Sequence, residues 1–575
     1  MIKIYEVLFF VVILHHVNAS CSKCEVITEN GKLEGTEYNK NNIKYIKFLG
    51  IPYAKPPIND LRFKSPQKLE GTNIKQKKNG DTSCVQKASS GGAYTGNEDC
   101  LYLNIYTPGL ELKGQGYPVM VWIHGGKFNS GSGIIDPSDL VHEQVIVVSI
   151  NYRLGVFGFL SLQSAQIPGN MGLKDQMMAL NWILENIDKF GGNKYSITLF
   201  GTDAGAASIH YLLMYGGARH NFNKAIMQSG SAYSPWALQN NVFEHAKAFL
   251  TNLGLYTKNQ NEPSKPKEEV RSKNYDFKSF DTSKIFDAAE KVLSSDNKLQ
   301  QIDPIFAPVI ELNTSKDAII NKTTDEAMDY LKNNMIKWRP VILGFNDAEG
   351  IEVLNYEKTI QSNWMENNNL DKYLPRKVVN TKNHTVEGKP INAALAEEYK
   401  LDEQDTRYQL FVKMMGDAWY TYGIYKTATK MIELKKSFNT YLYRFSISDS
   451  KLKTNLCQEC KKISGANHGD EVKYIFNSKG NTVSEIEKHK KIVKLWTNFA
   501  KYENPTTSTQ WYQVEGLHGL WNTFDKDKYY FDLNDFTMHD FNSSEYGRMR
   551  RWGEVYKAVN DRLENKKSRK SEKAI

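Results

Sequence analysis

Long hydrophobic runs are almost absent from this chain. One apolar run, residues 7–14, lies near the N-terminus, and it is too short to span a bilayer. No other stretch is long and apolar enough to cross a membrane. Because the C-terminus is charged, neither a transmembrane anchor nor a GPI signal is visible there. We therefore expect a protein without a membrane anchor.

Concentrations of one charge are also rare. The 74 Lys and Arg residues are dispersed among 65 Asp and Glu residues, which leaves a modest net charge of +9 over 575 residues. No basic stripe is interleaved with aromatic residues, so nucleic acid is not an expected partner. The one basic cluster, residues 566–570, is interpreted as a solvated, frayed end.

The N-terminal segment has the features of a secretory signal. Lys3 precedes the apolar run, and Val17-Asn18-Ala19 supplies a small residue for cleavage after Ala19. The chain is therefore predicted to consist of a signal peptide (1–19), a large folded domain (20–562) and a basic C-terminal tail (563–575). We expect a soluble protein that is secreted to the extracellular space.

Cysteine is scarce, and the six residues are Cys21, Cys24, Cys84, Cys100, Cys457 and Cys460. Export permits disulfides and an even count suits complete pairing, but the sequence alone does not give the connectivity. Two C-x-x-C pairs could in principle hold zinc together, but they lie far apart in the chain. We expect no metal site and no cofactor. Sequons for N-glycosylation occur at Asn313, Asn321, Asn383 and Asn542.

Strand and helix signals alternate through the first half of the chain. Short β-branched runs predict buried strands over 119–123, 145–150, 197–200 and from 225. Helical spacing predicts helices over 173–187 and from Ala204 to Met214. This alternation indicates an α/β fold with a mostly parallel central sheet flanked by helices. The polar segment 257–284 is interpreted as a surface excursion and a candidate lid.

A strand, a tight turn and a helix meet at Gly201-Thr202-Asp203-Ala204-Gly205. The spacing is that of the nucleophile elbow G-x-S-x-G, in which the central serine carries the chemistry. Here the central residue is Asp203. Ligands of such folds bind at the carboxyl ends of the strands, where this turn lies.

Several longer motifs resemble the type-B carboxylesterase/cholinesterase family in their order and spacing. They are FLGIPYAKPP (48–57), NEDCLYLNIYTP (97–108), VWIHGGKFNSGS (121–132), SINYRLGVFGFL, GNMGLKDQMMALNWILENIDKFGGN and MQSGSAYSPWA. The resemblance covers nearly all of the chain after the signal and implies an α/β-hydrolase fold. It also implies a hydrolytic site made of a nucleophile, an acid, a histidine and backbone N–H donors.

The resemblance assigns residues to each part of that site. The nucleophile position is Asp203, the acid is Glu349 and the histidine is His468. The backbone donors of the oxyanion hole are Gly125, Gly126 and Ala204. The resemblance also pairs Cys84 with Cys100, whereas Cys21–Cys24 and Cys457–Cys460 are candidate local bridges.

Two departures from the family pattern meet at this site. Asp203 has no proton to give at neutral pH, so it cannot repeat the attack that a serine makes with the help of His468. Lys127 follows His124-Gly125-Gly126 where the family has a small residue, and it intrudes on the oxyanion hole. Lys127 either extends into solvent or pairs with Asp203, which needs a partner if it is buried. A paired carboxylate would favour charged His468, a poor general base.

Three functions are compatible with this pattern. The first is a catalytically impaired protein that binds a small hydrophobic ester-like ligand or an extracellular protein, as adhesion-type members of the family do without the serine. The second is a hydrolase that uses Asp203 as its nucleophile, as epoxide hydrolases on this fold use an aspartate. The third is an ordinary carboxylic ester hydrolase with residual activity, although Ser208, further down the helix, is not expected to reach the site.

Overall fold

The computed structural model describes residues 24–572 with internal gaps. The segments outside the description are 41–42, 78–81, 89–93, 112–113, 240, 258–265, 296–302, 313–316, 337, 357–369, 371–372, 376–377, 379–383, 401–406, 435–438, 449–457, 477–481, 508–519 and 525–528.

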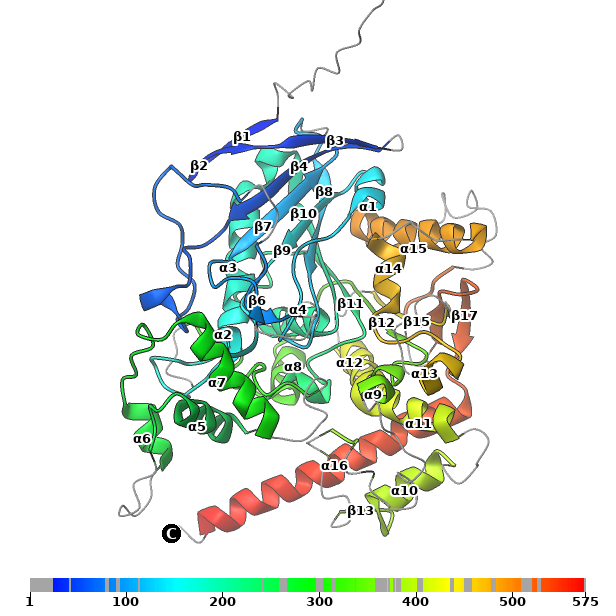
Figure 1. Cartoon of the computed structure of the whole chain (residues 1–575). Coiled ribbons are helices and arrows are strands. Elements are labelled where there is room, and N and C mark those ends of the chain that lie inside the picture. The colour runs from blue at the N-terminus through cyan, green and yellow to red at the C-terminus, as the bar shows by residue number, and fades with distance from the viewer. Residues whose placement is uncertain are drawn as a thin grey trace, which may run out of the picture.

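One sheet of eleven strands organises the described part of the chain (Figure 1). Its seven central strands, from β16 to β9, run parallel, and antiparallel strands close both edges. In spatial order the strands are β17 (Thr537–Asp540), β16 (Tyr529–Asp532), β15 (Thr440–Phe445), β12 (Val341–Asn346), β11 (Lys224–Gln228), β10 (Gly192–Thr202), β8 (Tyr117–Ile123), β9 (Ile146–Ile150), β7 (Tyr102–Thr107), β4 (Ile43–Pro52) and β3 (Thr36–Lys40). Three small hairpins lie outside it: β1 (Glu25–Thr28) with β2 (Gly31–Glu34), β5 (Gln86–Lys87) with β6 (Tyr94–Thr95), and β13 (Thr385–Val386) with β14 (Lys389–Pro390).

The helices flank this sheet. They are α1 (Ser138–His142), α2 (Gly155–Phe159), α3 (Met171–Asn186), α4 (Ala204–Met214), α5 (Val242–Asn252), α6 (Pro266–Ser272), α7 (Thr282–Ser295), α8 (Thr324–Asn333), α9 (Ile351–Tyr356), α10 (Ile391–Glu398), α11 (Arg407–Gly416), α12 (Tyr422–Ile432), α13 (Gln458–Lys462), α14 (Lys473–Phe476), α15 (Val483–Tyr502) and α16 (Ser543–Glu572).

Each face of the sheet has its own hydrophobic core. Successive residues of β8 alternate between them: Val119 and Val121 pack with α3 and α4, whereas Met120 and Trp122 pack with α14 and α15. All these side chains are buried, as expected for parallel strands covered on both faces. Figure 1 shows α3 and α15 on opposite sides of the strands.

The predicted elements around the nucleophile elbow are present. Helix α4 has the predicted bounds, β8, β10 and β11 contain the predicted strands, and β9 begins one residue later than predicted. The helix predicted over 173–187 is α3, which starts two residues earlier and passes into a 3-10 turn, Ile187–Phe190.

Most described residues of 257–284 are exposed, as expected for a surface segment, but three of its side chains are anchored in the core. Val270, Tyr275 and Phe277 are buried, and the ring of Phe277 lies 4.9 Å from that of Phe63. Arg62 donates to the carbonyls of Phe277 and Phe280 at 2.6 and 2.8 Å, which ties the segment to the body. The apolar side chains spaced through a polar sequence therefore anchor it to the core.

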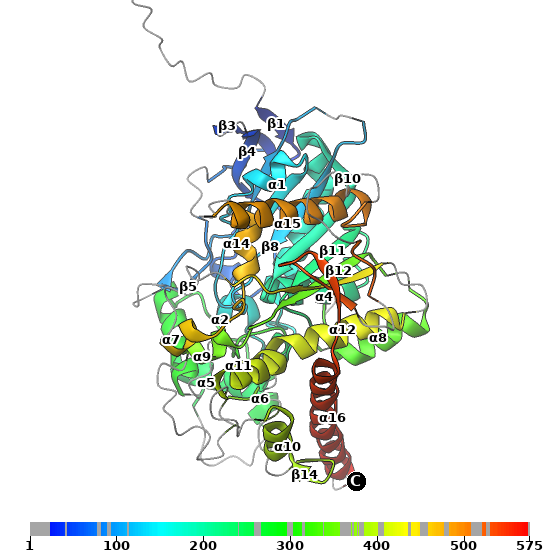
Figure 2. The ribbon, with the colours of Figure 1, turned by 90° about the vertical axis from the view of Figure 1, so that its right-hand side faces the viewer.

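The C-terminal residues form part of a long helix. Helix α16 continues to Glu572, so the basic cluster 566–570, predicted to be a frayed end, is helical. Residues 563–572 contain no Gly or Pro and several good helix formers, which explains the continuation. Figure 2 shows α16 extending downwards from the body. Among the described residues, no helix is both long and apolar enough to cross a membrane.

Candidate functional site

The nucleophile elbow joins β10 to α4 at Asp203. This residue has φ 54° and ψ −120°, a backbone conformation that is costly for a residue with a side chain. The glycines on either side allow the chain to pass close to β8. A Cβ added at Gly201 or Gly205 would lie 2.5 or 2.0 Å from the carbonyl oxygen of Ile123. The turn therefore holds the Asp203 side chain at the carboxyl end of the central strands.

The carboxylate of Asp203 is fully engaged by the loop that follows β8. Its Oδ2 accepts hydrogen bonds from the backbone N–H groups of Gly126 and Lys127, at 2.8 and 2.7 Å. Of the donors predicted from the sequence, Gly126 is in this position, and Lys127 takes the second place. Gly125 packs against the Cβ of Asp203 instead, and Ala204 is the first residue of α4.

The side chain of Lys127 points inward. Its Nζ lies 2.7 Å from Asp203 Oδ1 and 3.4 Å from Glu352 Oε2. It also lies over the rings of Tyr420 and Trp236, at 4.7 and 5.0 Å from their centroids. Only 5% of Lys127 is exposed. The alternative in which this lysine extends into solvent is therefore wrong, because two carboxylates and two aromatic faces hold its ammonium group inside.

Glu349 and His468 meet beside the same carboxylate. Glu349 lies in the turn after β12 and His468 in the loop before α14, yet His468 Nδ1 is 2.7 Å from Glu349 Oε2. The other ring nitrogen, Nε2, lies 3.5 Å from Asp203 Oδ1 and 3.2 Å from Lys127 Nζ. The imidazole stacks on the ring of Tyr420, with centroids 4.2 Å apart. The three residues assigned from the sequence thus form one cluster.

The charges of the cluster shift its proton equilibria. Burial raises the pKa of Asp203, but Lys127 and His468 outweigh it and hold that pKa well below its usual range. Burial and Lys127 lower the pKa of His468, but Glu352, Glu349 and Asp203 raise it to about 10. At neutral pH the cluster therefore holds a carboxylate, an ammonium group and an imidazolium in contact.

The sequence matches the model of a known protein family over most of its length. The model described as the carboxylesterase family matches residues 22–545. The chain belongs to the carboxylesterase family. The α/β-hydrolase fold predicted from the sequence is confirmed by this match and by the solved structure described next.

Relatives of this carboxylesterase-family chain include two insect esterases. Juvenile hormone esterase of Tribolium castaneum is 32% identical over 512 residues, which cover 84% of each chain. Esterase FE4 of Myzus persicae is 32% identical over 502 residues, covering 82% of this chain and 83% of that one. Among solved structures, juvenile hormone esterase from Manduca sexta with OTFP covalently attached has a TM-score of 0.74 and 27% identity, and covers 93% of this chain and 99% of its own.

Several residues of the cluster were not predicted from the sequence. Glu352 and Tyr420 bond to each other and enclose Lys127 together with Trp236. Glu352 lies three residues after Glu349, which is the one sequence signal that could have pointed to it. Tyr420 belongs to a π-helical turn, Asp417–Thr421, far along the chain, and no local pattern links it to the elbow.

The buried carboxyl group of Glu471 bonds to residues next to Asp203 and Glu349. Glu471 accepts hydrogen bonds from Thr202 Oγ1 at 2.8 Å and Asn346 Nδ2 at 2.7 Å. Burial and the nearby Glu349 raise its pKa. Because Thr202 precedes Asp203 and Asn346 donates its backbone N–H to Glu349, Glu471 links the two arms of the site. It lies three residues after His468, and this spacing is the sequence signal that points to it.

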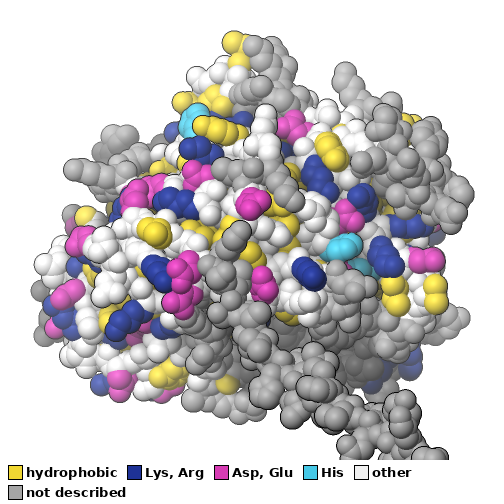
Figure 3. Space-filling view, turned by 90° about the horizontal axis from the view of Figure 1, so that it is seen from above, with side chains coloured by type: hydrophobic (Ala, Val, Ile, Leu, Met, Phe, Trp, Pro, Cys, Tyr) yellow, Lys and Arg dark blue, Asp and Glu magenta, His cyan; other side chains and the backbone are white. Residues whose placement is uncertain are grey.

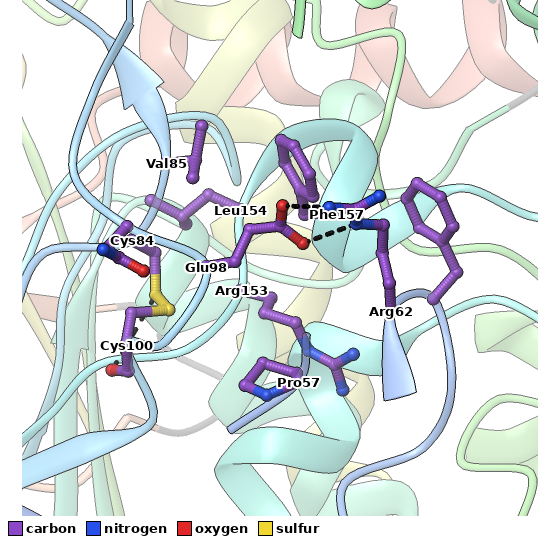
Figure 4. Close-up of a pocket in the computed structure, with 11 residues that line it drawn as sticks. Pro57, Arg62, Cys84, Val85, Glu98, Cys100, Arg153, Leu154 and Phe157 are labelled. Atoms are coloured by element: carbon purple, nitrogen blue, oxygen red, sulfur yellow. Dashed lines mark hydrogen bonds and ion pairs between the residues drawn. A yellow bond between two sulfur atoms is a disulfide. The ribbon is translucent and has the colours of Figure 1, made fainter. Parts of the chain in front are cut away.

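One predicted disulfide is present, and it borders a small pocket shown in Figure 4. Cys84 and Cys100 are bonded, as the family resemblance implied. Cys24 is also disulfide-bonded. The side chains of Cys21, Cys457 and Cys460 lie outside the described residues, so the local bridges stay predictions. No group of three His, Cys, Asp or Glu residues within the description is arranged to hold a metal ion.

Two of the four predicted glycosylation sites can be placed. Asn321 precedes α8 and Asn542 precedes α16, and both residues are exposed. The Oδ1 of Asn542 accepts the backbone N–H of Glu545, which caps α16. Asn313 and Asn383 lie outside the described residues.

Proposed function

We propose that this chain is a secreted carboxylesterase-family protein that does not hydrolyse esters efficiently, because Asp203 stands where the nucleophilic serine would be. In this proposal it acts by binding a small hydrophobic ester-like molecule or an extracellular protein. The single observation that carries the proposal is the engagement of both Asp203 oxygens. Oδ1 is paired with Lys127 Nζ, and Oδ2 takes the two backbone donors of Gly126 and Lys127.

Those two donors are the groups that would stabilise a substrate oxyanion. Removing one such donor from a working hydrolase typically lowers the rate by about 10²–10³-fold. Here a resident carboxylate takes both, so an ester carbonyl has neither a nucleophile nor donors to receive it. His468 adds to the loss, because a histidine whose pKa is raised to about 10 is already protonated at neutral pH and cannot accept a proton.

Secretion and glycosylation are part of the proposal. The Cys84–Cys100 disulfide supports an oxidising compartment, and the exposure of Asn321 and Asn542 supports modification of these two sequons. Asn313 and Asn383 are proposed on their sequence motif alone. Mass spectrometry of the protein recovered from culture medium, before and after enzymatic removal of N-glycans, would locate each site.

The test of the main proposal is ester hydrolysis by the purified protein. We expect turnover of a nitrophenyl ester no faster than that of a heat-treated sample, and no labelling by an organophosphate active-site probe. Robust turnover that the organophosphate inhibits would contradict the proposal.

A repaired variant shows whether the rest of the machinery is intact. Asp203→Ser combined with Lys127→Gly restores a hydroxyl beside His468 and removes the intruding side chain. We expect esterase activity to appear in this double variant and to disappear again on adding His468→Gln. The single variant Lys127→Gly, which lacks the serine, is the matched control and should remain inactive.

Hydrolysis with Asp203 as the nucleophile is the second candidate. The contact of Glu349 with His468 and the 3.5 Å approach of His468 to Asp203 favour it, since His468 would activate water against an aspartyl ester. Against it, Oδ1 is already bonded to Lys127. Single turnover in heavy-oxygen water would place the label in Asp203 if this candidate is correct. Residual esterase chemistry through Ser208 is disfavoured, because that hydroxyl is buried and bonded to Gln176.

A further inference from the structure

Lys127 and Asp203 bring together the two groups from which an amide bond forms. A primary amine and a carboxyl group lie 2.7 Å apart, Nζ to Oδ1, with side chains that are 7% and 5% exposed. We propose that Lys127 and Asp203 condense, with loss of one water, into an isopeptide bond that cross-links the loop after β8 to the nucleophile elbow. The inference goes beyond the proposed function and has a different readout, since it is measured by mass and not by ester turnover.

The carbonyl that must be attacked is already polarised. Asp203 Oδ2 receives the N–H groups of Gly126 and Lys127 at 2.8 and 2.7 Å. When Nζ adds to Cγ, the negative charge develops on this oxygen. The donors that would hold the oxyanion of an ester substrate are therefore in place for an amide-forming intermediate within the chain.

Proton acceptors and donors lie on the other side of the pair. Glu352 Oε2 is 3.4 Å from Nζ and can take a proton from the amine. His468 Nε2 is 3.5 Å from Oδ1, the oxygen that must leave as water, and can donate to it. Tyr420 bonds to Glu352 and stacks on His468, so it fixes both groups around Lys127.

The reaction balances without any other reactant. One ammonium proton moves along the 2.7 Å contact to Oδ1, which leaves a neutral amine and a carboxylic acid. The Nζ lone pair forms the C–N bond and the carbonyl π electrons move to Oδ2. Glu352 takes a proton from nitrogen, His468 gives a proton to Oδ1, the C–O bond breaks and water departs as the carbonyl re-forms. The proton held by Glu352 then returns to His468.

The surroundings favour the amide over the separated charges. Trp236 and Tyr420 are 1% and 0% exposed and lie over the amine, which limits the return of water. A neutral amide also removes the desolvation cost of burying an ammonium group and a carboxylate. Groups held in contact in this way react with effective molarities of about 10⁵–10⁸ M in well-oriented intramolecular systems.

The experiment is intact-mass measurement of the purified full chain after N-glycan removal and disulfide reduction. We expect a mass lower than that of the unmodified chain by one water. Proteolysis should then release a branched peptide that joins the segment containing Lys127 to the segment containing Asp203. An unmodified mass after prolonged incubation would overturn the proposal. A loss of water with separate, unbranched peptides would also overturn it, since it would indicate a cyclic imide at an aspartate.

Three variants test the chemistry. Lys127→Arg keeps a cation beside Asp203 but should retain the full mass, whereas Asp203→Asn should form the same branch with loss of one ammonia. Glu352→Gln should slow the appearance of the branched peptide at least tenfold during incubation, and an unchanged rate would overturn the role of Glu352 as proton acceptor. Circular dichroism melting checks that each variant is folded, and the wild-type measurement stands even where a variant does not fold.

Discussion

Lys127 places its ammonium group between Asp203 and Glu352 and over the rings of Trp236 and Tyr420. Three carboxylates, those of Asp203, Glu349 and Glu352, share this space with one lysine and one histidine. A charged His468 brings the cluster closest to neutrality, which is the physical reason for its raised pKa. The residues that would make a hydrolytic triad thus form a charge-compensated buried network.

The raised pKa of His468 makes stability depend on pH in one direction. A histidine whose pKa rises from 6.5 to about 10 on folding contributes stability that is fully present below about pH 6.5 and is lost as pH rises through about 10. We therefore expect the melting temperature of the wild type to fall more steeply than that of His468→Gln between about pH 7 and pH 10. Differential scanning fluorimetry across this range measures the difference.

His142, an exposed histidine of α1, provides the matched control. The variant His142→Gln should follow the wild-type profile. Because Glu349 and Glu352 raise the pKa of His468 whether or not Asp203 is condensed with Lys127, the direction of the effect is the same in both forms. If the melting temperatures of the wild type and His468→Gln fell in parallel with pH, the raised pKa of His468 would not be the cause of the pH dependence.

At the scale of elements, a buried ion pair holds the segment before α7 against the body. Arg62 donates through Nε and Nη2 to both carboxylate oxygens of Glu98, each at 2.7 Å, as the dashed lines in Figure 4 show. The side chains are 8% and 5% exposed. The same guanidinium caps the carbonyls of Phe277 and Phe280. One side chain therefore satisfies four acceptors on two separate segments.

Replacing Arg62 removes these partners together. Arg62→Met should destabilise the fold by about 3–5 kcal/mol, because it leaves the buried carboxylate of Glu98 without its cation. We expect a lower urea midpoint and faster proteolysis between residues 266 and 282. Both are measurable on the same samples by fluorescence and by limited trypsin digestion.

A surface ion pair that joins nearly the same segments provides the control for Arg62→Met. Lys278 pairs with Asp60, and both side chains are more than half exposed. Lys278→Met should leave the urea midpoint unchanged, since solvent already screens this pair. Equal destabilisation by the two variants would show that burial of the Arg62–Glu98 pair is not what holds the segment.

The elements predicted most accurately from the sequence are those marked by a short, continuous sequence pattern. The strands of the central sheet are short β-branched runs, and the elbow has glycines at fixed positions, so β8, β9 and α4 could be placed from the sequence. The polar composition of 257–284 predicted a surface segment but did not reveal that Val270, Tyr275 and Phe277 anchor it in the core. Average composition does not indicate which few side chains face the core.

The same distinction applies to the site. Asp203, Glu349 and His468 could be named because motifs carry them, whereas Tyr420 and Trp236 could not. These two aromatic residues reach Lys127 from separate elements, through packing that only the folded chain creates. The inward direction of Lys127 likewise depends on Glu352 and on the rings above it, which the sequence alone left as one of two alternatives.

At the scale of the whole molecule, the sheet and its two cores form the body, and α16 lies below it in the views of Figures 1 and 2. The face shown in Figure 3 carries Lys and Arg side chains interspersed with Asp and Glu. The buried contacts described for α16 come from its first half. Arg548 donates to Asp417 at 2.8 Å, and Trp552 donates to the hydroxyl of Tyr399 at 2.8 Å.

These contacts predict where the chain can be shortened. Removal of residues 563–575 keeps Arg548, Trp552 and the buried Val559, so we expect an unchanged melting temperature and a soluble protein. Removal of everything after residue 542 deletes all of α16 and leaves Asp417 buried without Arg548. Loss of the Arg548–Asp417 pair alone should lower the free energy of unfolding by about 3–5 kcal/mol, and the loss of Trp552 from the core should lower it further. Thermal melting and size-exclusion chromatography of both truncated proteins measure the difference. Marked destabilisation by the shorter deletion would show that the folded domain extends beyond residue 562, because the last turns of α16 would then carry packing energy of their own.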